Sequence, residues 1–288
     1  MNSGRSTSTM PQVRGCTGLI AHIGFPTHAF KAPLIYNPYF AHAGVDVVVV
    51  PMGCRAADFA EFLRAVFKLS NIVGALITMP HKVTTVGLLD EASPAVRIAG
   101  ACNAVRRDAD GRLVGDLFDG EGFVRSVRNK GVRIEGARVL VVGAGGVGSA
   151  ICAAFAAAGA GAISLYDVNA EAAAALAERL RAHYPALEVS TGHNDPAGHQ
   201  IVVNATPMGM NPGDPLPLDV ERLAPDTFVG EVVMRDEMTA FLRAAQARGC
   251  RWQVGTDMLF EQIPAYLEFF GLPTTTPQTL RELACLND

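Results

Sequence analysis

The sequence predicts an α/β fold of two domains, each built on a sheet with mostly parallel strands. Apolar segments of strand length alternate with segments of helical periodicity along most of the chain, and this order favours parallel strands joined by crossover helices. The length of 288 residues, with 49% hydrophobic residues, is sufficient for two domains of ordinary size, each with its own core.

The first half of the chain contains three predicted strands and a hairpin. The strands are expected at residues 17–23, 45–50 and 73–78, and the intervening helices at 33–42, 56–69 and through about 99. Two short strands then flank Asp-Ala-Asp-Gly at 108–111, which is typical of a hairpin turn. A helix at 120–129 leads to the expected crossing between domains. We therefore predict a disordered tail at 1–16 and a substrate-binding domain at 17–130.

The second half begins with the most informative segment of the chain, residues 138–167. A buried strand runs into a glycine-rich turn, an alanine-rich helix, a second strand and an acid, Asp167. This is the dinucleotide-binding fingerprint of a Rossmann domain in its required context. Gly143 permits the tight turn, Gly145 lets the backbone approach a pyrophosphate, and Gly148 lets helix and strand pack closely. The alternative is a glycine-rich turn in another kind of α/β protein.

The fingerprint places a Rossmann NAD(P)-binding domain at residues 131–256, with later strands at 188–190, 201–204, 228–232 and 251–254. Helices at about 258–269 and 277–286 form a C-terminal segment, 257–288, expected to pack back on the first domain. The residues expected at the cofactor are Gly143, Ala144, Gly145, Gly146, Val147, Gly148, Asp167, Asn204, Thr206, Met208 and Gly255. Asp167 would accept bonds from the ribose hydroxyls and repel a 2′-phosphate, so the sequence predicts NAD in preference to NADP.

Composition excludes several other classes of function. The 24 basic and 28 acidic residues form no basic block, so nucleic acid is not an expected partner. No apolar segment is long enough to cross a membrane and none resembles a targeting signal, so we expect a cytoplasmic protein. The six cysteines show no metal-ligand spacing and are interpreted as reduced thiols, mostly in the core. His81 is interpreted as a helix-start residue, and no metal site is expected.

Polar residues gather where strands and helices begin or end. Thr78, Lys82, Asn103, Asp119 and Gln262 all occupy such positions, and in open α/β sheets ligands bind at the carboxyl ends of strands. These residues also have purely structural interpretations. Lys82 would be a solvated surface lysine and Asp119 a helix N-cap. Asn103 would brace a turn, and Gln262 would lie on a helix surface.

Taken together, these residues resemble a known family. From about residue 17 to 287 the chain resembles the shikimate dehydrogenases, including quinate/shikimate dehydrogenases. The resemblance rests on blocks in a fixed order: Gly24-Phe25-Pro26 with Ala32-Pro33, Thr78-Met79-Pro80-His81-Lys82, Gly100-Ala101-Cys102-Asn103, Gly115-Asp116 with Asp119-Gly120, and Asn204-Ala205-Thr206 with Gly209-Met210. It implies that Lys82 and Asp119 are the catalytic pair, and that Asn103 and Gln262 hold substrate hydroxyls with Thr78 nearby.

The resemblance implies reversible hydride transfer between a nicotinamide cofactor and a ring hydroxyl of shikimate, quinate or a related cyclic hydroxy acid. Such a reaction needs a group that takes the hydroxyl proton, and a lysine beside a carboxylate can relay it. Amide side chains both donate and accept hydrogen bonds, which suits vicinal hydroxyls. The expected partner is therefore a small-molecule substrate. A homodimer is expected by family analogy alone.

The chain departs from the family pattern at several polar positions of the pocket. Phe30-Lys31-Ala32-Pro33 replaces a Ser-x-Ser-Pro segment, Leu76 replaces an asparagine before Thr78, and Leu117-Phe118 replaces Asn-Thr before Asp119. Lys31 is expected to take over as the anion partner, with His28 as the alternative. Asp167-Val168-Asn169 replaces an Asn-Arg-Thr segment that grips a 2′-phosphate, which adds to the expectation of NAD.

Two other functions fit the same fold. One is a non-catalytic regulator that binds a dinucleotide and a metabolite; retention of both Lys82 and Asp119 argues against it, because a sensor needs no proton relay. The other is a different enzyme on the same fold, such as a tetrahydrofolate dehydrogenase. The blocks around Asn103 and Gln262 make that assignment less favourable.

Overall fold

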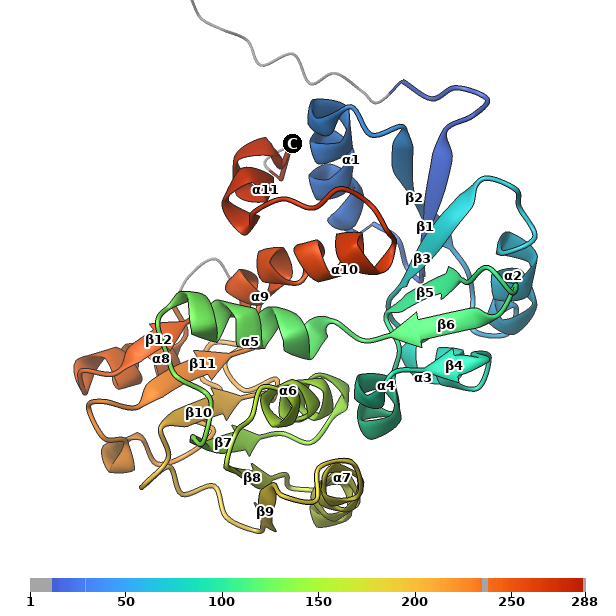
Figure 1. Cartoon of the computed structure of the whole chain (residues 1–288). Helices are drawn as coiled ribbons and strands as arrows, with labels where there is room; N and C mark the ends of the chain where they lie inside the picture. Colours follow the sequence, from blue (N-terminus) through green and yellow to red (C-terminus); the bar gives the residue numbers. More distant parts are fainter. Residues whose placement is uncertain (1–11, 29, 235–237, 287–288) are drawn as a thin grey trace, which may run out of the picture. The chain divides into compact units, whose positions relative to one another are not determined.

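The computed structural model describes residues 12–28, 30–234 and 238–286, and has an α/β fold with two six-stranded sheets (Figure 1). The strand orders are β2-β1-β3-β5-β6-β4 and β12-β11-β10-β7-β8-β9. The predicted fold class is confirmed. Of the tail predicted at residues 1–16, residues 1–11 lie outside the described part of the chain.

Backbone contacts divide the chain into two compact units. The first comprises the residues up to Glu91, Cys102–Asp116 and the residues from Tyr266 onward. The second comprises Ala92–Ala101 and Leu117–Ala265. Each unit therefore contains segments that are distant in the sequence.

The first sheet joins parallel strands to an antiparallel hairpin. Its strands are β1 (Gly18–Gly24), β2 (Val47–Gly53), β3 (Ile72–Ile77), β4 (Glu91–Ala92), β5 (Ala104–Arg107) and β6 (Leu113–Asp116). β1 is parallel to both β2 and β3, whereas β5 runs antiparallel to β3 and pairs with β6. The helices of this unit include α1 (Ala32–Ala43), α2 (Phe59–Val66), α3 (Lys82–Val86) and α11 (Pro277–Leu283), whereas α4 (Pro94–Ala99) belongs to the second unit. Ile20, Ala21 and Ile23 of β1 are fully buried, and because the adjacent residues Ile20 and Ala21 lie on opposite faces of the sheet, both faces are covered at this strand.

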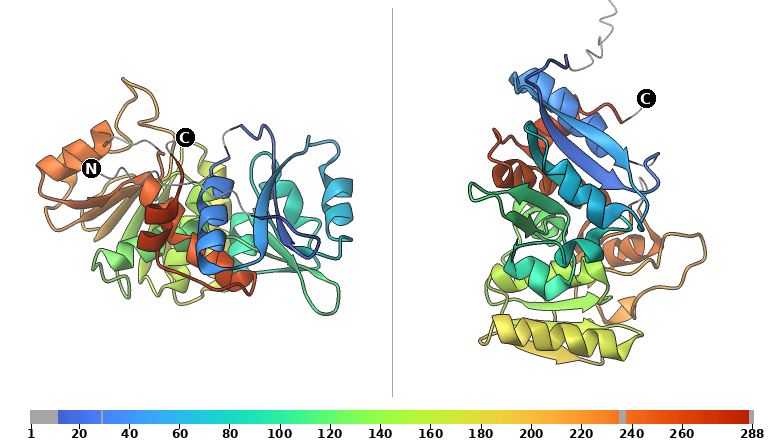
Figure 2. Two further views of the ribbon diagram at one scale, coloured as in Figure 1. Left: turned by 90° about the horizontal axis from the view of Figure 1, so that it is seen from above. Right: turned by 90° about the vertical axis from the view of Figure 1, so that its right-hand side faces the viewer.

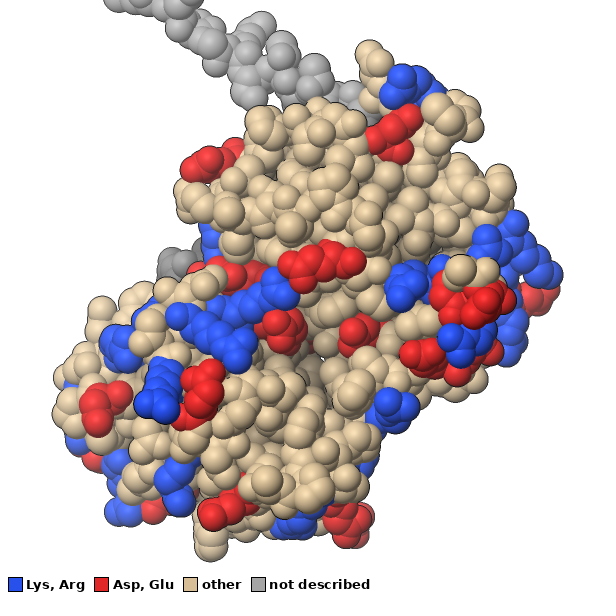
Figure 3. Space-filling model, viewed as in Figure 1, with Lys and Arg blue, Asp and Glu red and all other residues tan. Residues whose placement is uncertain are grey.

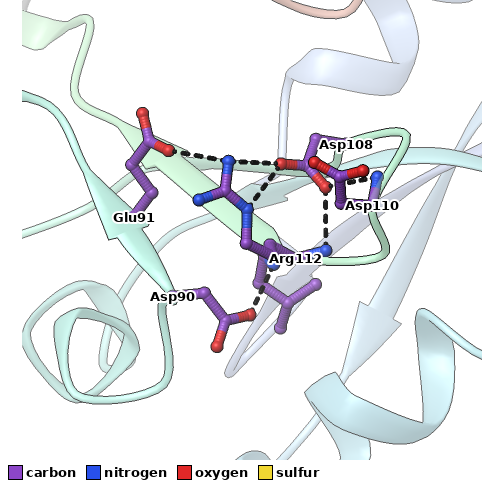
Figure 4. A network of polar contacts seen from close by, with 6 residues as sticks. Asp90, Glu91, Asp108, Asp110 and Arg112 are labelled. Carbon is purple, nitrogen blue, oxygen red and sulfur yellow. Dashed lines mark hydrogen bonds and ion pairs between the residues drawn. The ribbon is translucent and has the colours of Figure 1, made fainter.

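The hairpin is tied to the neighbouring edge of the sheet by Arg112 (Figure 4). Its guanidinium lies 3.0 Å from the Asp108 carboxylate and 3.2 Å from that of Glu91. Asp108 also accepts the backbone N–H of Arg112 at 2.8 Å, which closes the predicted turn. Because the Arg112 and Glu91 side chains are about half exposed, solvent screens these charges and each pair adds about 1 kcal/mol or less. Elsewhere, acidic and basic side chains are interspersed on the face shown in Figure 3, in keeping with a net charge of −4.

The second sheet is parallel throughout, with helices on both faces (Figure 2). Its strands are β7 (Arg138–Val142), β8 (Ala162–Tyr166), β9 (Glu188–Thr191), β10 (Ile201–Asn204), β11 (Phe228–Glu231) and β12 (Arg251–Gln253). The helices are α5 (Asp119–Asn129), α6 (Gly146–Ala157), α7 (Ala170–His183), η1 (Val220–Arg222), α8 (Ala240–Ala247) and α9 (Gly255–Glu261). Phe123 and Phe155 belong to the core on the side of α5, α6 and α7, whereas Phe241 belongs to the core beneath α8. The strand order is that of a Rossmann domain, which has its binding crevice between β7 and β10.

The prediction of one continuous helix at 258–269 was wrong, because this range contains the end of α9 and a second helix, α10 (Ile263–Phe269). Gln262 ends α9, and Pro264 follows two residues later. Proline has no N–H for an intrahelical bond and its ring clashes with the preceding turn, so a continuous helix is interrupted there. α11 packs against α1, and the Tyr39 hydroxyl donates a 2.7 Å hydrogen bond to the carbonyl of Pro273.

Close packing of α5 on α6 depends on Gly120. A Cβ atom at this position would overlap the backbone carbonyl of Ala150, which cannot move without distorting α6. We expect Gly120→Ala to lower the free energy of unfolding by about 1–3 kcal/mol through overpacking. Gly87→Ala is the matched control, since the nearest atom to its added Cβ is 3.9 Å away. Denaturant unfolding of both variants measures the difference, and equal stabilities would contradict this account of the packing.

Candidate functional site

A cavity of roughly 490 Å³ lies in the second unit, at the carboxyl ends of β7, β8 and β10. It is lined by Val142, Gly143, Gly145, Tyr166, Asp167, Val168, Ala205, Thr206, Pro207, Met208, Asn211, Asp214, Pro215 and Pro217. This is the crevice at which the strand order of the sheet reverses. Ligands of open α/β sheets bind at such a position.

The glycine-rich turn at the edge of this cavity uses its glycines in three different ways. Gly143 has φ +108°, and a Cβ atom on it would lie 2.7 Å from the carbonyl oxygen of Ala205. A Cβ atom on Gly148 would overlap the carbonyl oxygen of Gly143. Gly145 and Gly146, by contrast, are exposed and have open space where a side chain would be. The turn therefore leaves bare backbone at the start of α6, where the helix dipole favours an anion such as a pyrophosphate.

Asp167 braces this turn. One carboxylate oxygen accepts the backbone N–H of Ala144 at 2.7 Å, and the other accepts that of Asn169 at 2.8 Å. The carboxylate thus links the end of β8 to the glycine-rich turn. The sequence predicted only that this carboxylate accepts hydrogen bonds from the ribose hydroxyls, and did not predict its structural role.

Asn204 shapes the other wall of the cavity from beneath. Its side chain is fully buried, and its Nδ2 donates to the carbonyl of Met208 at 3.0 Å. Its Oδ1 accepts from the hydroxyl of Thr206 at 2.6 Å and from the N–H of Thr206 at 3.1 Å. Asn204 therefore folds residues 204–208 into a tight loop rather than presenting itself to the cavity.

The predicted cofactor residues fall into two groups. Gly143, Gly145, Asp167, Thr206 and Met208 line the cavity. The other predicted residues are not among the lining residues: Ala144, Gly146, Val147, Gly148, Asn204 and Gly255. Sequence reasoning missed Tyr166 and Val168, although their position at the end of β8, next to Asp167, was a signal.

In the first unit, three predicted residues gather at one edge of the sheet. Thr78 follows β3, and its N–H donates to the carbonyl of Ile23 on β1 at 2.9 Å. The carbonyl of Asn103 accepts from the end of β3 at 2.8 Å, and the carbonyl of Lys82 accepts the N–H of Cys102 at 2.9 Å. These backbone bonds fix the starts of α3 and β5 beside the carboxyl end of β3. Asn103 is buried and Lys82 half-buried.

His81 holds the start of α3 in place. Its ring is buried, lies 4.0 Å from that of Phe59 in a parallel stack, and has Nε2 2.8 Å from the carbonyl oxygen of Cys54. His81 occupies the N-cap position of α3, directly before Lys82. Within residues 12–28, 30–234 and 238–286, no three His, Cys, Asp or Glu side chains are grouped as metal ligands.

His22 is a residue of this edge that sequence reasoning missed. Its ring stacks on Phe30, with 4.1 Å between centroids, and Phe30 stands where the family pattern has a serine. Burial, and secondarily the positive charge of Lys82, lower the pKa of His22 to about 4. Its Nδ1 is buried without a hydrogen-bond partner. A histidine among the apolar residues of β1 was the available signal. Lys31, in contrast, is exposed at the N-cap of α1.

Asp119 and Gln262 belong to the second unit, on helices that pack against each other. Asp119 is the first residue of α5 and only 8% exposed; the N-cap is Phe118, so Asp119 is not the simple cap of the structural interpretation. Gln262 ends α9, and a Cβ atom on Gly122 of α5 would lie 2.6 Å from its Cβ. The Oε1 atom of Gln262 is buried without a hydrogen-bond partner, so it is an acceptor that a hydroxyl can satisfy.

Known proteins resemble this chain along almost its whole length. Residues 23–105 match the model of the shikimate dehydrogenase substrate binding domain, and residues 124–170 match the ThiF family. A shikimate dehydrogenase (NADP(+)) of Rubrobacter xylanophilus is 36% identical over 88% of this chain and 90% of its own length.

None of the described helices is long and apolar enough to span a membrane.

Solved structures of shikimate and quinate dehydrogenases also resemble this chain. The shikimate 5-dehydrogenase of Listeria monocytogenes, crystallised with shikimate and NAD, has a TM-score of 0.89 at 27% identity and covers 96% of this chain and 99% of its own. The quinate dehydrogenase of Corynebacterium glutamicum, in complex with NAD, has a TM-score of 0.81 at 31% identity and covers 93% and 98% of the two chains.

The relatives correct one prediction, the preference for NAD over NADP. Four curated relatives that are 32–36% identical to this chain are each named shikimate dehydrogenase (NADP(+)). The prediction treated the Asp167 carboxylate as free to select a ribose. Each oxygen of this carboxylate also accepts a backbone N–H, one from Ala144 and one from Asn169, so an acid at this position has a structural role in addition to any contact with a cofactor.

The lowered pKa of His22 makes a prediction about stability. Because the folded-state pKa of His22 lies below the usual 6.5, the unfolded state takes up a proton first as the pH falls. The stabilising contribution of neutral His22 is therefore complete above pH 6.5 and is lost as the pH falls toward 4. Relative to His22→Phe, which keeps a ring on Phe30, the wild type should lose on the order of 2–3 kcal/mol between pH 7 and pH 4. Urea unfolding across this range measures the loss, with exposed His42→Gln as control. A constant difference between wild type and His22→Phe would show that His22 is not held neutral.

Proposed function

The chain belongs to the shikimate dehydrogenase family, and we propose that it catalyses reversible hydride transfer between NADP and a ring hydroxyl of shikimate, quinate or a related cyclic hydroxy acid. The observation that carries the proposal is the side-chain-free turn at Gly145 and Gly146, which opens the start of α6 beside the cavity at the β7–β10 crevice. A dinucleotide fits this arrangement, because its pyrophosphate needs bare backbone at a helix N-terminus.

The proposed division of labour follows the two domains expected from the sequence. Residues 17–130 are assigned to the substrate, residues 131–256 to the cofactor, and the segment 257–288 to the first domain. The units of the structure differ from these bounds, because α5 and residues 257–265 belong to the second unit. The gathering of Thr78, Lys82 and Asn103 at one edge of the first sheet supports the first role. The cofactor residues are those named above, with Gly143, Gly145, Asp167, Thr206 and Met208 at the cavity wall.

Lys82 and Asp119 form the proposed catalytic pair. A nicotinamide cofactor bound at the cavity would supply the acceptor for the hydride of the carbon that carries the hydroxyl group. The hydroxyl proton must leave in the same reaction, and we assign its removal to the Lys82 amine, with the Asp119 carboxylate orienting that amine. In the reverse direction the same pair returns the proton to the alkoxide oxygen. The low exposure of Asp119 keeps such a carboxylate away from bulk water.

Substrate hydroxyls are assigned to the amides of Asn103 and Gln262, with Thr78 beside them. The partnerless Oε1 of Gln262 supports this role, because a buried acceptor without a hydrogen bond costs about 1–3 kcal/mol, which a bound hydroxyl would offset. We assign the substrate's negative group to Lys31, since Phe30 and Ala32 have no side-chain donors.

Removing either member of the catalytic pair tests the reaction. We expect Lys82→Ala and Asp119→Asn to lower kcat by about 10²- to 10⁴-fold, the usual contribution of a positioned acid or base. The dissociation constant for NADP should stay unchanged in both variants. NADP reduction with shikimate and with quinate is the measurement, and exposed Lys68→Ala is the control. A wild type that binds NADP without turning over either acid would instead favour a regulator.

Replacing Lys31 tests recognition of the anion. Loss of one charged hydrogen bond should raise KM for shikimate and quinate by about tenfold in Lys31→Ala, with kcat nearly unchanged. Lys31→Ser introduces a hydroxyl donor next to Phe30 and should recover part of the loss. Steady-state kinetics with both acids decide the point. An unaltered KM would remove Lys31 from the substrate site.

A further inference from the structure

Glu231 is a buried acid that neither the sequence motifs nor the proposed mechanism uses. It is the last residue of β11 and is 1% exposed. In the sheet register it lies directly beside Asn204, the last residue of β10. Its carboxylate is thus adjacent to the residue that folds one wall of the cofactor cavity.

Contacts lead from Glu231 to that wall through Asn204. The two residues pair in the sheet register, and hydrogen bonding from the Asn204 side chain acts to lower the pKa of the Glu231 carboxyl. Asn204 in turn holds the carbonyl of Met208 and both the N–H and the hydroxyl of Thr206. The Thr206 hydroxyl then accepts the N–H of Met208 at 3.1 Å. Thr206 and Met208 both line the cavity, so these contacts end at its surface.

The same carboxylate also supports the far end of the loop. The hydroxyl of Thr239 donates to Oε2 of Glu231 at 2.9 Å and accepts the N–H of Leu242, which caps α8. A Cβ atom on Gly209 would lie 3.4 Å from the Thr239 methyl group, so Thr239 packs beneath that residue. Both ends of the segment 204–209 therefore rest on the pair formed by Glu231 and Thr239.

The charge state of Glu231 decides how many bonds it can accept. An ionised carboxylate accepts from Asn204 and Thr239 together, whereas a protonated carboxyl carries its own O–H donor and has fewer acceptor sites. Burial raises the pKa of Glu231 to about 7, and hydrogen bonds from Thr239 and Asn204 oppose that rise. Among the described residues, the groups facing the carboxylate are these two uncharged side chains, from β10 and the start of α8. On β12, Gln253 is also uncharged and packs on the side of Gly230.

We propose that Glu231 is a positioning residue for the cofactor: its ionised carboxylate fixes Asn204 and, through it, holds the loop 204–209 as the wall of the cavity. The inference rests on the proposed function, because it takes the cavity to be the dinucleotide site. Glu231 itself touches no reacting atom. It acts only through Asn204 and Thr239.

Amide hydrogen exchange of the ligand-free protein tests the hold on the loop without any cofactor. Glu231→Gln keeps the shape of the side chain but replaces one acceptor oxygen with a donor, and Glu231→Ala removes both oxygens. At pH 8 we expect exchange of the amides of Ala205, Thr206, Met208 and Gly209 to become about fivefold faster in both variants, because the loop loses its anchor. The control is Thr227→Val, which removes a buried 3.1 Å hydrogen bond to the carbonyl of His199 at the other end of the same strand. Unchanged protection in both Glu231 variants would overturn the proposal.

Cofactor affinity as a function of pH supplies a second readout that general destabilisation would not reproduce. The ratio of the NADP dissociation constants of Glu231→Gln and wild type should be about tenfold at pH 8.5 and should approach one at pH 6, where the wild-type carboxyl is also protonated. Taking the ratio cancels ionisation of the cofactor phosphate. A ratio that does not vary with pH would contradict the role of the charge. If the wild type bound no dinucleotide, the proposed function would fail, while hydrogen exchange would still decide whether Glu231 holds the loop.

Discussion

The structure of the second unit depends on the close approach of two backbones at the turn between β7 and α6. The start of α6 reaches the end of β7 only because Gly148 presents no side chain to the carbonyl of Gly143. Gly143 must also adopt a positive φ beside the carbonyl of Ala205. These contacts place the N-terminus of α6 at the crevice between β7 and β10, so the position of the cavity follows from them.

Both units use the carboxyl ends of parallel strands to gather side chains that are distant in the sequence. In the second, Val142, Asn204 and Glu231 are neighbours in register, and each ends its strand. In the first, backbone hydrogen bonds bring Thr78 and Asn103 to one edge. Backbone geometry therefore selects the positions, and the side chains at those positions supply the chemistry. Few polar side chains are therefore needed to build the candidate site of each unit.

Patterns that are local in the sequence predicted the α/β class, the hairpin and the glycine-rich turn, because each depends on residues close together in the chain. The interpretations that failed or were missing depend on distant partners. The bond from Ala144 to Asp167 exists only once β8 lies beside β7, and it accounts for an acid that the sequence assigned to the ribose. The stack of His22 on Phe30 and the bond of Thr239 to Glu231 likewise join separate elements. The break between α9 and α10 was the exception, because Pro264 could have been recognised in the sequence.

The central claim is that exposed backbone at Gly145 receives the pyrophosphate of a dinucleotide. Gly145→Ala isolates this claim, because an added Cβ meets no protein atom within 4 Å and enters only the space assigned to the ligand. Calorimetric titration with NADP should show binding at least about tenfold weaker than in the wild type, as expected when a side chain blocks close approach. The melting temperature should be unchanged. Wild-type affinity in this variant would contradict the account.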